Sequence, residues 1–182
     1  MMRGKRAVLT AADPANGETA RSWVNDPDVN VWLEVGHVPV THAAELAWYG
    51  RAEQDGAAGT AHQFEIHAAD DMRLLGMCGL VGIDRFDRHS EAGIFIGGGI
   101  ERGKGFGRDA LVTLLRFAFE TLGLNTVRIR VIEGNDEARA LYQSVGFSDV
   151  GVLREGRYVR GQFHDVLLLD MTRGDFDTRY AS

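Results

Sequence analysis

Alternating hydrophobic and polar residues predict short strands along this chain, and runs with a helical period predict the segments between them. One strand, for example, alternates over residues 63–67 after a tract of small residues. Pro27 disfavours helical geometry at the residue before it, so the first helix is expected to end ahead of this proline. The pattern predicts strands at residues 5–10, 63–67, 74–83, 91–97, 126–132, 148–158 and 163–171, and helices at residues 18–24, 42–55, 110–122 and 136–145.

One amphipathic helix follows a glycine-rich loop past the middle of the chain. Its apolar residues fall on a single stripe, and Gly123 can terminate it. A strand, a glycine-rich loop and a helix in succession form an anion site, because the first helical turn leaves amide hydrogens unpaired at the positive end of the helix dipole. The stripe consists of Leu111, Leu114, Leu115, Ala118 and Leu122.

The order of the predicted elements indicates a mixed α/β fold. A strand and two helices precede three strands, and the glycine-rich loop, a long helix, a strand, a helix and two strands follow. The last two strands are expected to pair around Arg160-Gly161. No repeat of fixed period is visible, which excludes solenoids. The chain of 182 residues suits one domain, from residue 1 to residue 182.

Composition and charge narrow the classes of partner. The net charge of -6 disfavours nucleic acid, which needs a basic surface, and favours cationic partners such as amines. The single cysteine, Cys78, lies in an apolar run and is expected to be an inert buried thiol. No apolar run reaches the roughly 20 residues that span a bilayer. A cytoplasmic location without a membrane partner is therefore expected.

The glycine-rich segment of residues 97–108 reads GGGIERGKGFGR and nearly matches a nucleotide-hydrolase phosphate loop. Gly98, Gly103 and Lys104 fit that motif, but Gly105 stands where a Ser or Thr would hold magnesium. A dinucleotide-binding fingerprint also fails, because residue 108 is not glycine. Both nucleotide interpretations are therefore weak.

The same segment fits R-x-x-G-x-G from Arg102 to Gly107. In such a loop the glycines let backbone amides approach a pyrophosphate, while Lys104 and Arg108 add positive charge. Taken alone, the motif is equally well explained by a glycine-rich turn with solvated cations. The flanking strand and helix favour phosphate binding.

Four motifs in one order resemble the GNAT acyl-CoA N-acyltransferase superfamily. The loop with the strand before it forms the first, and Asn135-x-x-Ala138-x-x-x-Tyr142-x-x-x-Gly146-Phe147 forms the second. Residues 25–29 and 161–166 are similar to the RimJ/RimL-like branch of that superfamily. The resemblance covers residues 3–173. It implies a mixed, mostly antiparallel sheet with about seven strands and about four helices, and a splayed pair of strands at the acyl-CoA site.

The resemblance implies that acetyl-CoA is the co-substrate and that no metal is needed. The loop would bind the pyrophosphate, and the strand before it would offer backbone groups to the pantetheine arm and the thioester. Asn135 would help to hold the pantetheine, and it also suits a helix N-cap. Glycines at 97–99 depart from the family pattern, which leaves the carbonyl contacts open. The implied cofactor-binding residues are Ile94, Phe95, Ile96, Gly97, Arg102, Gly103, Lys104, Gly105, Phe106, Gly107, Arg108, Asn135, Ala138 and Tyr142.

The reaction that the resemblance implies is direct transfer of an acetyl group to a primary amine. Amides near Ile96 and Gly97 would stabilise the developing oxyanion, and Tyr142 would protonate the departing thiolate. Only about one alkyl amine in a thousand is uncharged at neutral pH, so a general base is needed. Glu91 is the first candidate, with an exposed strand-edge carboxylate as its alternative interpretation. Without the resemblance, Tyr142 would be interpreted as a packing residue.

Several other polar and aromatic residues are weaker candidates. His164-Asp165 are adjacent on a strand, so they point to opposite faces and do not form a catalytic pair. Aromatic residues of the N-terminal region lie where the superfamily builds its acceptor pocket, although core packing also explains them. The residues concerned are His67, His89 and His164 as bases, Trp23, Trp32, Trp48 and Tyr49 in the pocket, and Asp28, Glu34 and His37 toward a cationic substrate.

The acceptor stays open at this stage between a small-molecule amine and a protein N-terminal amine, and a homodimer stays open as well. A second class of function is a non-catalytic acyl-CoA-binding or regulatory module of the same fold. Tyr142 and Asn135 favour an enzyme, because simple binding does not require a thiolate acid at that spacing. Gly105 disfavours a magnesium-dependent nucleotide hydrolase.

Overall fold

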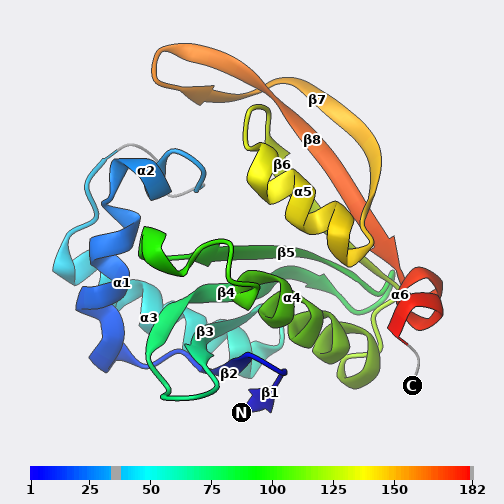
Figure 1. Ribbon diagram of the computed structural model, residues 1–182, viewed down its shortest axis with the longest axis horizontal. Coiled ribbons are helices and arrows are strands. Elements are labelled where there is room, and N and C mark those ends of the chain that lie inside the picture. The colour runs from blue at the N-terminus through cyan, green and yellow to red at the C-terminus, as the bar shows by residue number, and fades with distance from the viewer. Residues whose placement is uncertain (34–37, 181–182) are drawn as a thin grey trace.

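The chain folds around a sheet of eight strands with helices on both of its faces (Figure 1). The computed structural model describes residues 1–33 and 38–180. The strand order is β1-β2-β3-β4-β5-β6-β8-β7, and every neighbouring pair is antiparallel except β5 with β6. The strands are β1 (Met2–Arg3), β2 (Ala7–Ala11), β3 (His62–Ala68), β4 (Leu74–Asp84), β5 (His89–Ile96), β6 (Thr126–Ile132), β7 (Ser148–Val159) and β8 (Gln162–Thr172).

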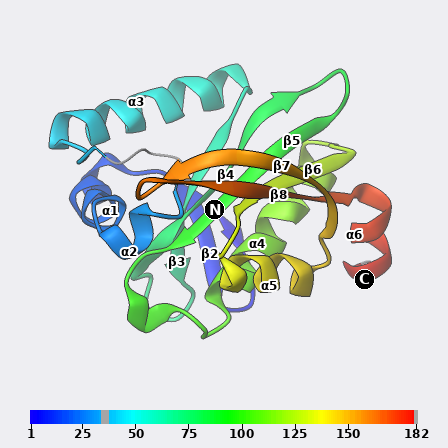
Figure 2. The same cartoon turned by 90° about the horizontal axis from the view of Figure 1, so that it is seen from above.

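The helices divide between the two faces of the sheet. Helices α4 and α5 cover one face, and α1 and α3 lie on the other (Figure 2). None of the described helices is both long and apolar enough to cross a membrane. The helices are α1 (Gly17–Val24), α2 (Pro27–Asn30), α3 (His42–Ala58), α4 (Phe106–Arg116), α5 (Asp136–Val145) and α6 (Arg173–Tyr180), with short helical segments η1 (Pro14–Asn16), η2 (Gly99–Glu101) and η3 (Phe117–Thr121).

The expected mixed, mostly antiparallel fold is confirmed. Strand β6 and helix α5 begin and end at the predicted residues. The short elements β1, α2 and α6 were not predicted, and neither were the helical segments η1 and η2. Helix α1 ends before Pro27 as expected, but the same proline occupies the first turn of α2, where its missing amide hydrogen costs nothing. Asp26 caps α2, because its carboxylate accepts a hydrogen bond from the Asp28 amide (2.9 Å).

Helix α4 holds the core on its face of the sheet. The predicted stripe from Leu111 to Ala118 is fully buried, and Leu122 is partly buried against it. The helix begins at Phe106 rather than at residue 110, because glycine and charged residues in its first turn hide the helical period. Burial of this stripe fixes the position of α4 and therefore of the glycine-rich loop before it.

Asp109 ties the N-terminus of α4 to the sheet. Its Oδ2 accepts hydrogen bonds from the backbone N–H groups of Arg6 (2.7 Å) and Ala7 (2.9 Å). Gly4 makes room for this contact, because a Cβ at that position would lie 2.2 Å from Asp109 Oδ2. The carboxylate also lies in the first turn of α4, where the helix dipole favours negative charge.

Strands β5 and β6 separate along their length. They pair in parallel only where residues 89–91 of β5 lie beside residues 126–128 of β6. Beyond Glu91, β5 continues to pair with β4, and β6 continues to pair with β8. The sheet therefore opens between the two strands, which confirms the predicted splay and exposes one backbone edge of β5 to the opening.

Candidate active site

The glycine-rich loop presents a row of unpaired amides to the opening. Gly103 (φ +74°) and Gly105 (φ +84°) adopt left-handed conformations that other residues rarely adopt. The first backbone hydrogen bond of α4 joins the Asp109 amide to the Gly105 carbonyl (3.1 Å). Among the described residues, the N–H groups of residues 103–108 have no acceptor in the protein. Six successive free donors at the positive end of a helix form an anion site.

A groove of about 730 Å³ runs from this loop along β5 to α5. It contains most of the residues that the sequence predicts for the cofactor. Its mouth carries the guanidinium groups of Arg102 and Arg108, and its inner end reaches the Tyr142 ring. The predicted residues that line the groove are Ile94, Phe95, Ile96, Arg102, Gly103, Gly105, Gly107, Arg108, Asn135, Ala138 and Tyr142.

Three predicted cofactor residues, Gly97, Lys104 and Phe106, do not line the groove. The Lys104 ammonium pairs with Glu101 (3.4 Å) instead of facing the groove. The Phe106 ring lies under the Arg73 guanidinium, 5.5 Å from its carbon atom. The side chains of Lys104 and Phe106 are therefore engaged outside the groove.

Gly97 differs from the other glycines of the loop because it is closely packed. A Cβ on Gly97 would lie 2.2 Å from ring carbons of Trp23, whereas Gly98 and Gly99 have no atom within 4 Å of such a Cβ. The Gly97 amide donates to the Leu75 carbonyl (2.7 Å). The end of β5 is thus fixed from both sides.

The backbone of β5 offers the amides of alternate residues to the opening. Residues along an antiparallel pair alternate between exchanging both backbone hydrogen bonds and exchanging none. The Gly97 amide is used by β4, so Ile96, opposite Gly76, directs its amide away from β4 and toward the groove. Of the two predicted oxyanion donors, the Gly97 amide is already used, and the Ile96 amide remains.

Asn135 and Tyr142 both line the groove, Asn135 from the N-cap of α5 and Tyr142 from within the helix. Asn135 caps α5, because its Oδ1 accepts a hydrogen bond from the Ala138 amide (3.3 Å). Its side-chain amide group has no partner among the described residues. Tyr142 is 6% exposed, and burial raises its pKa to about 12. The Tyr142 hydroxyl has no hydrogen-bond partner in the part of the chain that the structure describes.

A second cavity of about 570 Å³ meets the groove on the face of the sheet that α1 and α3 cover. Its walls are mainly apolar, and they include Trp48, Met77 and Val40. The two cavities share seven lining residues, and these mark the place where their contents would meet. The shared residues are Trp32, Leu33, Ile94, Phe95, Arg130, Ile132 and Tyr142.

Glu91 lies in the second cavity and not in the groove. Side chains alternate along a strand, so Glu91 and Phe95 point to the α3 face of β5. The Glu91 Oε1 accepts a hydrogen bond from Arg130 Nε at 2.8 Å, and Arg130 lines both cavities. Glu91 is therefore an ion-paired carboxylate next to the junction, rather than an isolated strand-edge residue.

The other sequence candidates scatter over the molecule. Trp32 and Trp48 line the second cavity, whereas Trp23 packs on Gly97 and Phe95, and Tyr49 is a core residue. The imidazole of His67 binds the buried Glu65 carboxylate (3.0 Å) and does not line either cavity. His89, His164 and Asp28 also lie outside both cavities. Glu34 and His37 lie outside the described residues.

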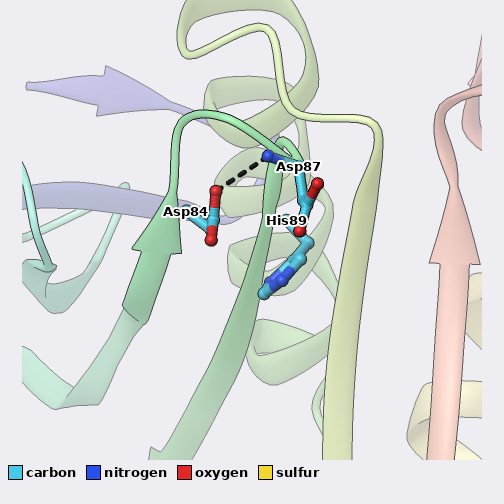
Figure 3. A group of neighbouring side chains, drawn as sticks. All are labelled: Asp84, Asp87 and His89. Atoms are coloured by element: carbon cyan, nitrogen blue, oxygen red, sulfur yellow. Dashed lines mark hydrogen bonds between the residues drawn. The ribbon is translucent and has the colours of Figure 1, made fainter.

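One group among the described residues has the spacing of a metal site, namely Asp84, Asp87 and His89 at the turn between β4 and β5 (Figure 3). The Asp84 Oδ1 accepts hydrogen bonds from the amides of Phe86 and Asp87, both at 2.8 Å. These bonds lower the pKa of Asp84 and account for its place in the turn. The group lies at the opposite end of β5 from the groove.

Three charged residues of the second cavity were not predicted from the sequence, namely Glu45, Arg51 and Arg130. Arg130 follows the alternation of β6, which predicts an exposed cation but gives no sign of its partner Glu91. Glu45 stands in the first turn of α3, where an acidic residue is ordinary. Its place in the cavity depends on how α3 packs on the sheet, and no local pattern carries that information.

These features define a class of protein. Residues 6–148 match the acetyltransferase (GNAT) domain family, and the chain belongs to that family, in its RimJ/RimL-like branch. The chain is 36% identical over 107 residues to the putative ribosomal N-acetyltransferase YdaF of Bacillus subtilis (strain 168). That match covers 59% of this chain and 58% of the relative, which is less than two thirds of its length.

Another relative and a solved structure are similar over more of their length. The spermidine N(1)-acetyltransferase of Vibrio cholerae serotype O1 is 32% identical over 138 residues, 76% of each chain. The crystal structure of spermidine N-acetyltransferase from Vibrio cholerae in complex with CoA and spermine has a TM-score of 0.84. It is 21% identical and covers 93% of this chain and 97% of that one, which shows that the two share a fold.

Proposed function

We propose that this chain is an acetyl-CoA-dependent N-acetyltransferase that transfers the acetyl group directly to a primary amine of a small molecule. The observation that carries the proposal is the junction of two cavities at Tyr142. The groove begins at the glycine-rich loop, where the amides of residues 103–108 are free. The second cavity, called the acceptor cavity below, has mainly apolar walls that also contain carboxylates. Residues 1–182 would form a single domain of this kind, and the cytoplasmic location stays a prediction.

The glycine-rich loop and the groove fit acetyl-CoA. Free amides of residues 103–108 would bind the pyrophosphate, with Arg102 and Arg108 adding charge at the mouth. The free edge of β5 would hold the pantetheine arm through backbone groups, and Asn135 would offer its unpaired amide group from the other wall. Gly107 and Ala138 keep this part of the groove open, because neither carries a large side chain.

The chemistry requires two proton movements that side chains of this chain can make. Acetyl-CoA supplies an activated acetyl thioester, and transfer forms a carbon–nitrogen bond while it breaks the carbon–sulfur bond. One proton must therefore leave the amine nitrogen, and one must reach the sulfur. Tyr142 keeps its proton at neutral pH, because its pKa is raised to about 12, and its hydroxyl would deliver that proton to the sulfur.

Glu91 would accept the proton of the amine. Its carboxylate lies in the acceptor cavity beside Arg130, which reaches the junction. Transfer would pass through a water, since Glu91 does not itself line the groove. The Ile96 amide would stabilise the negative charge that develops on the acetyl oxygen.

The finer identity of the acceptor is also a proposal. The relatives point to two kinds of amine, since one is named for ribosomal acetylation and another for spermidine. The acceptor cavity is bounded by α3 and by the segment that carries Trp32 and Leu33, which favours a small molecule over a folded protein. The competing function is a module of the same fold that binds acyl-CoA without turnover.

The test is a thiol-release assay with acetyl-CoA and a panel of linear amines, aminoglycosides, amino acids and peptide N-termini. We expect release of free CoA with at least one small amine, and a mass increase of one acetyl group on that amine. Calorimetry would measure acetyl-CoA binding in parallel. Tight binding without release for any acceptor would support the module without turnover and contradict the enzyme.

A further inference from the structure

Glu45 is a buried carboxylate without a partner in the wall of the acceptor cavity. Its residue is 6% exposed, and it lies in the first turn of α3. In the part of the chain that the structure describes, its side chain makes no hydrogen bond and no ion pair. A buried carboxylate normally has a partner, because removal of a charge from water is costly. The Glu45 carboxylate is therefore available to a cation that enters the cavity.

Within residues 1–33 and 38–180, no cation forms an ion pair with Glu45. Arg21 on α1 lowers the pKa of Glu45 through its charge, but the Arg21 guanidinium is bound to both carboxylate oxygens of Glu18. Arg130 donates to Glu91 in the same cavity. Arg51 also lines this cavity, but it is exposed, lies six residues further along α3 and makes no ion pair with Glu45. The cavity thus contains one carboxylate that is already paired and one that is not.

Glu45 is set apart from the place where the acetyl group would be transferred. It lines the acceptor cavity but not the groove, and none of the residues that join the two cavities belongs to α3. The same cavity is also lined by the apolar side chains of Trp48 and Met77, and by Phe95 at the junction. A cation on Glu45 would therefore be a different group from the amine that reacts at Tyr142, with an apolar linker between the two.

On the basis of the proposed function, we propose that the acceptor is a diamine, and that Glu45 binds the amino group that is not acetylated. The ammonium ion of the acceptor would pair with the Glu45 carboxylate, its alkyl chain would lie along the apolar walls, and its other amine would reach the junction. An acceptor with a carboxylate at that end, such as an amino acid, would be repelled by Glu45. Glu45 would thus determine specificity and take no part in proton transfer.

The experiment compares linear diaminoalkanes with monoalkylamines of the same length, in the wild type and in Glu45→Gln. Glutamine keeps the shape of the side chain and removes its charge. We expect Glu45→Gln to raise KM for the diamine about tenfold or more, since hydrogen bonds between charged groups contribute on that scale. We expect kcat to change little, and the kinetics of the monoamine to change little.

Glu53→Gln is the matched control. Glu53 lies on the same helix, is exposed and lines neither cavity, so its variant changes the same charge without changing the site. An equal rise in KM for diamine and monoamine in Glu45→Gln, or an equal fall in kcat for both, would overturn the proposal. A wild type that uses monoamines as well as diamines would also overturn it and leave the proposed function intact.

A direct binding measurement keeps the two proposals separable. If no acceptor releases thiol, the proposed function fails, and calorimetry with a diamine and the CoA-loaded protein still tests Glu45. Diamine binding that Glu45→Gln weakens about tenfold or more would support the carboxylate as the cation site. Equal binding to both proteins, or none to either, would contradict it.

The stability of the same variant gives an independent prediction. Burial raises the pKa of Glu45 above the ordinary value of 4.5, so the folded state holds this proton more tightly than the unfolded state. The wild type should therefore lose stability as pH rises from 4.5 through the raised pKa of the folded state. Glu45→Gln should lack this loss, and at neutral pH it should unfold at the same or a higher temperature than the wild type. A lower unfolding temperature at neutral pH would show that Glu45 has a partner in the protein.

Discussion

Replacement of Tyr142 with phenylalanine should lower kcat about 100-fold or more, because a positioned general acid contributes at least that much. The affinity for acetyl-CoA should stay within about twofold, since the ring would remain in the wall of the groove. The ring packs edge-on against Phe147 at 6.1 Å, and phenylalanine preserves that contact. Steady-state thiol release would give kcat, and calorimetry with acetyl-CoA would give the affinity.

Tyr180→Phe is the control for this experiment. The Tyr180 hydroxyl donates to the Val145 carbonyl (2.8 Å), at the C-terminal end of α5 and outside both cavities. Its removal should reduce stability by about 1 kcal/mol and leave kcat unchanged. If Tyr142→Phe also left kcat unchanged, Tyr142 would be a packing residue, and the proton for the sulfur would have to come from elsewhere.

Local patterns in the sequence predicted those elements whose bounds depend on neighbouring residues, such as alternating side chains and helix caps. Strand β6 alternates cleanly, and α5 has an Asn135 cap and a Gly146 end, so both were predicted with their bounds. Helix α4 was placed too late, because its first turn carries the glycines and charges of the anion site. The residues proposed to bind the pyrophosphate are those that break the helical period.

The candidate site also has one part that the sequence predicts, the groove, and one part that it does not, the second cavity. Most residues of the loop and groove lie close together in the sequence, on one strand, one loop and two helices. Short sequence motifs of the family can therefore predict them. The second cavity is lined by side chains from elements that are far apart in the chain, among them α3, β4, β5 and β6. The ion pair of Arg130 with Glu91 and the burial of Glu45 arise only when those elements pack together. The sequence showed the charges but not the distances between them.

Gly97→Ala should reduce both stability and turnover. The added Cβ would lie 2.2 Å from the Trp23 ring, and the backbone of Gly97 cannot move away freely, because its amide is bound to Leu75. Overpacking of this kind costs about 1 to 3 kcal/mol in unfolding free energy. A shift of about 1 Å at the end of β5 would displace the Ile96 amide and lower kcat/KM by up to about 100-fold.

Gly99→Ala separates close packing from flexibility at the entrance of the loop. A Cβ at Gly99 has no atom within 4 Å, so this variant removes the same conformational freedom without a clash. Denaturant unfolding and thiol release, measured on both variants, should show a large loss for Gly97→Ala and none for Gly99→Ala. Equal losses would mean that the glycines provide mobility. Losses confined to Gly97→Ala would mean that a glycine is needed at this position for the close approach of Trp23. Helix α1 would then set the position of the strand end at which the acetyl transfer is proposed to take place.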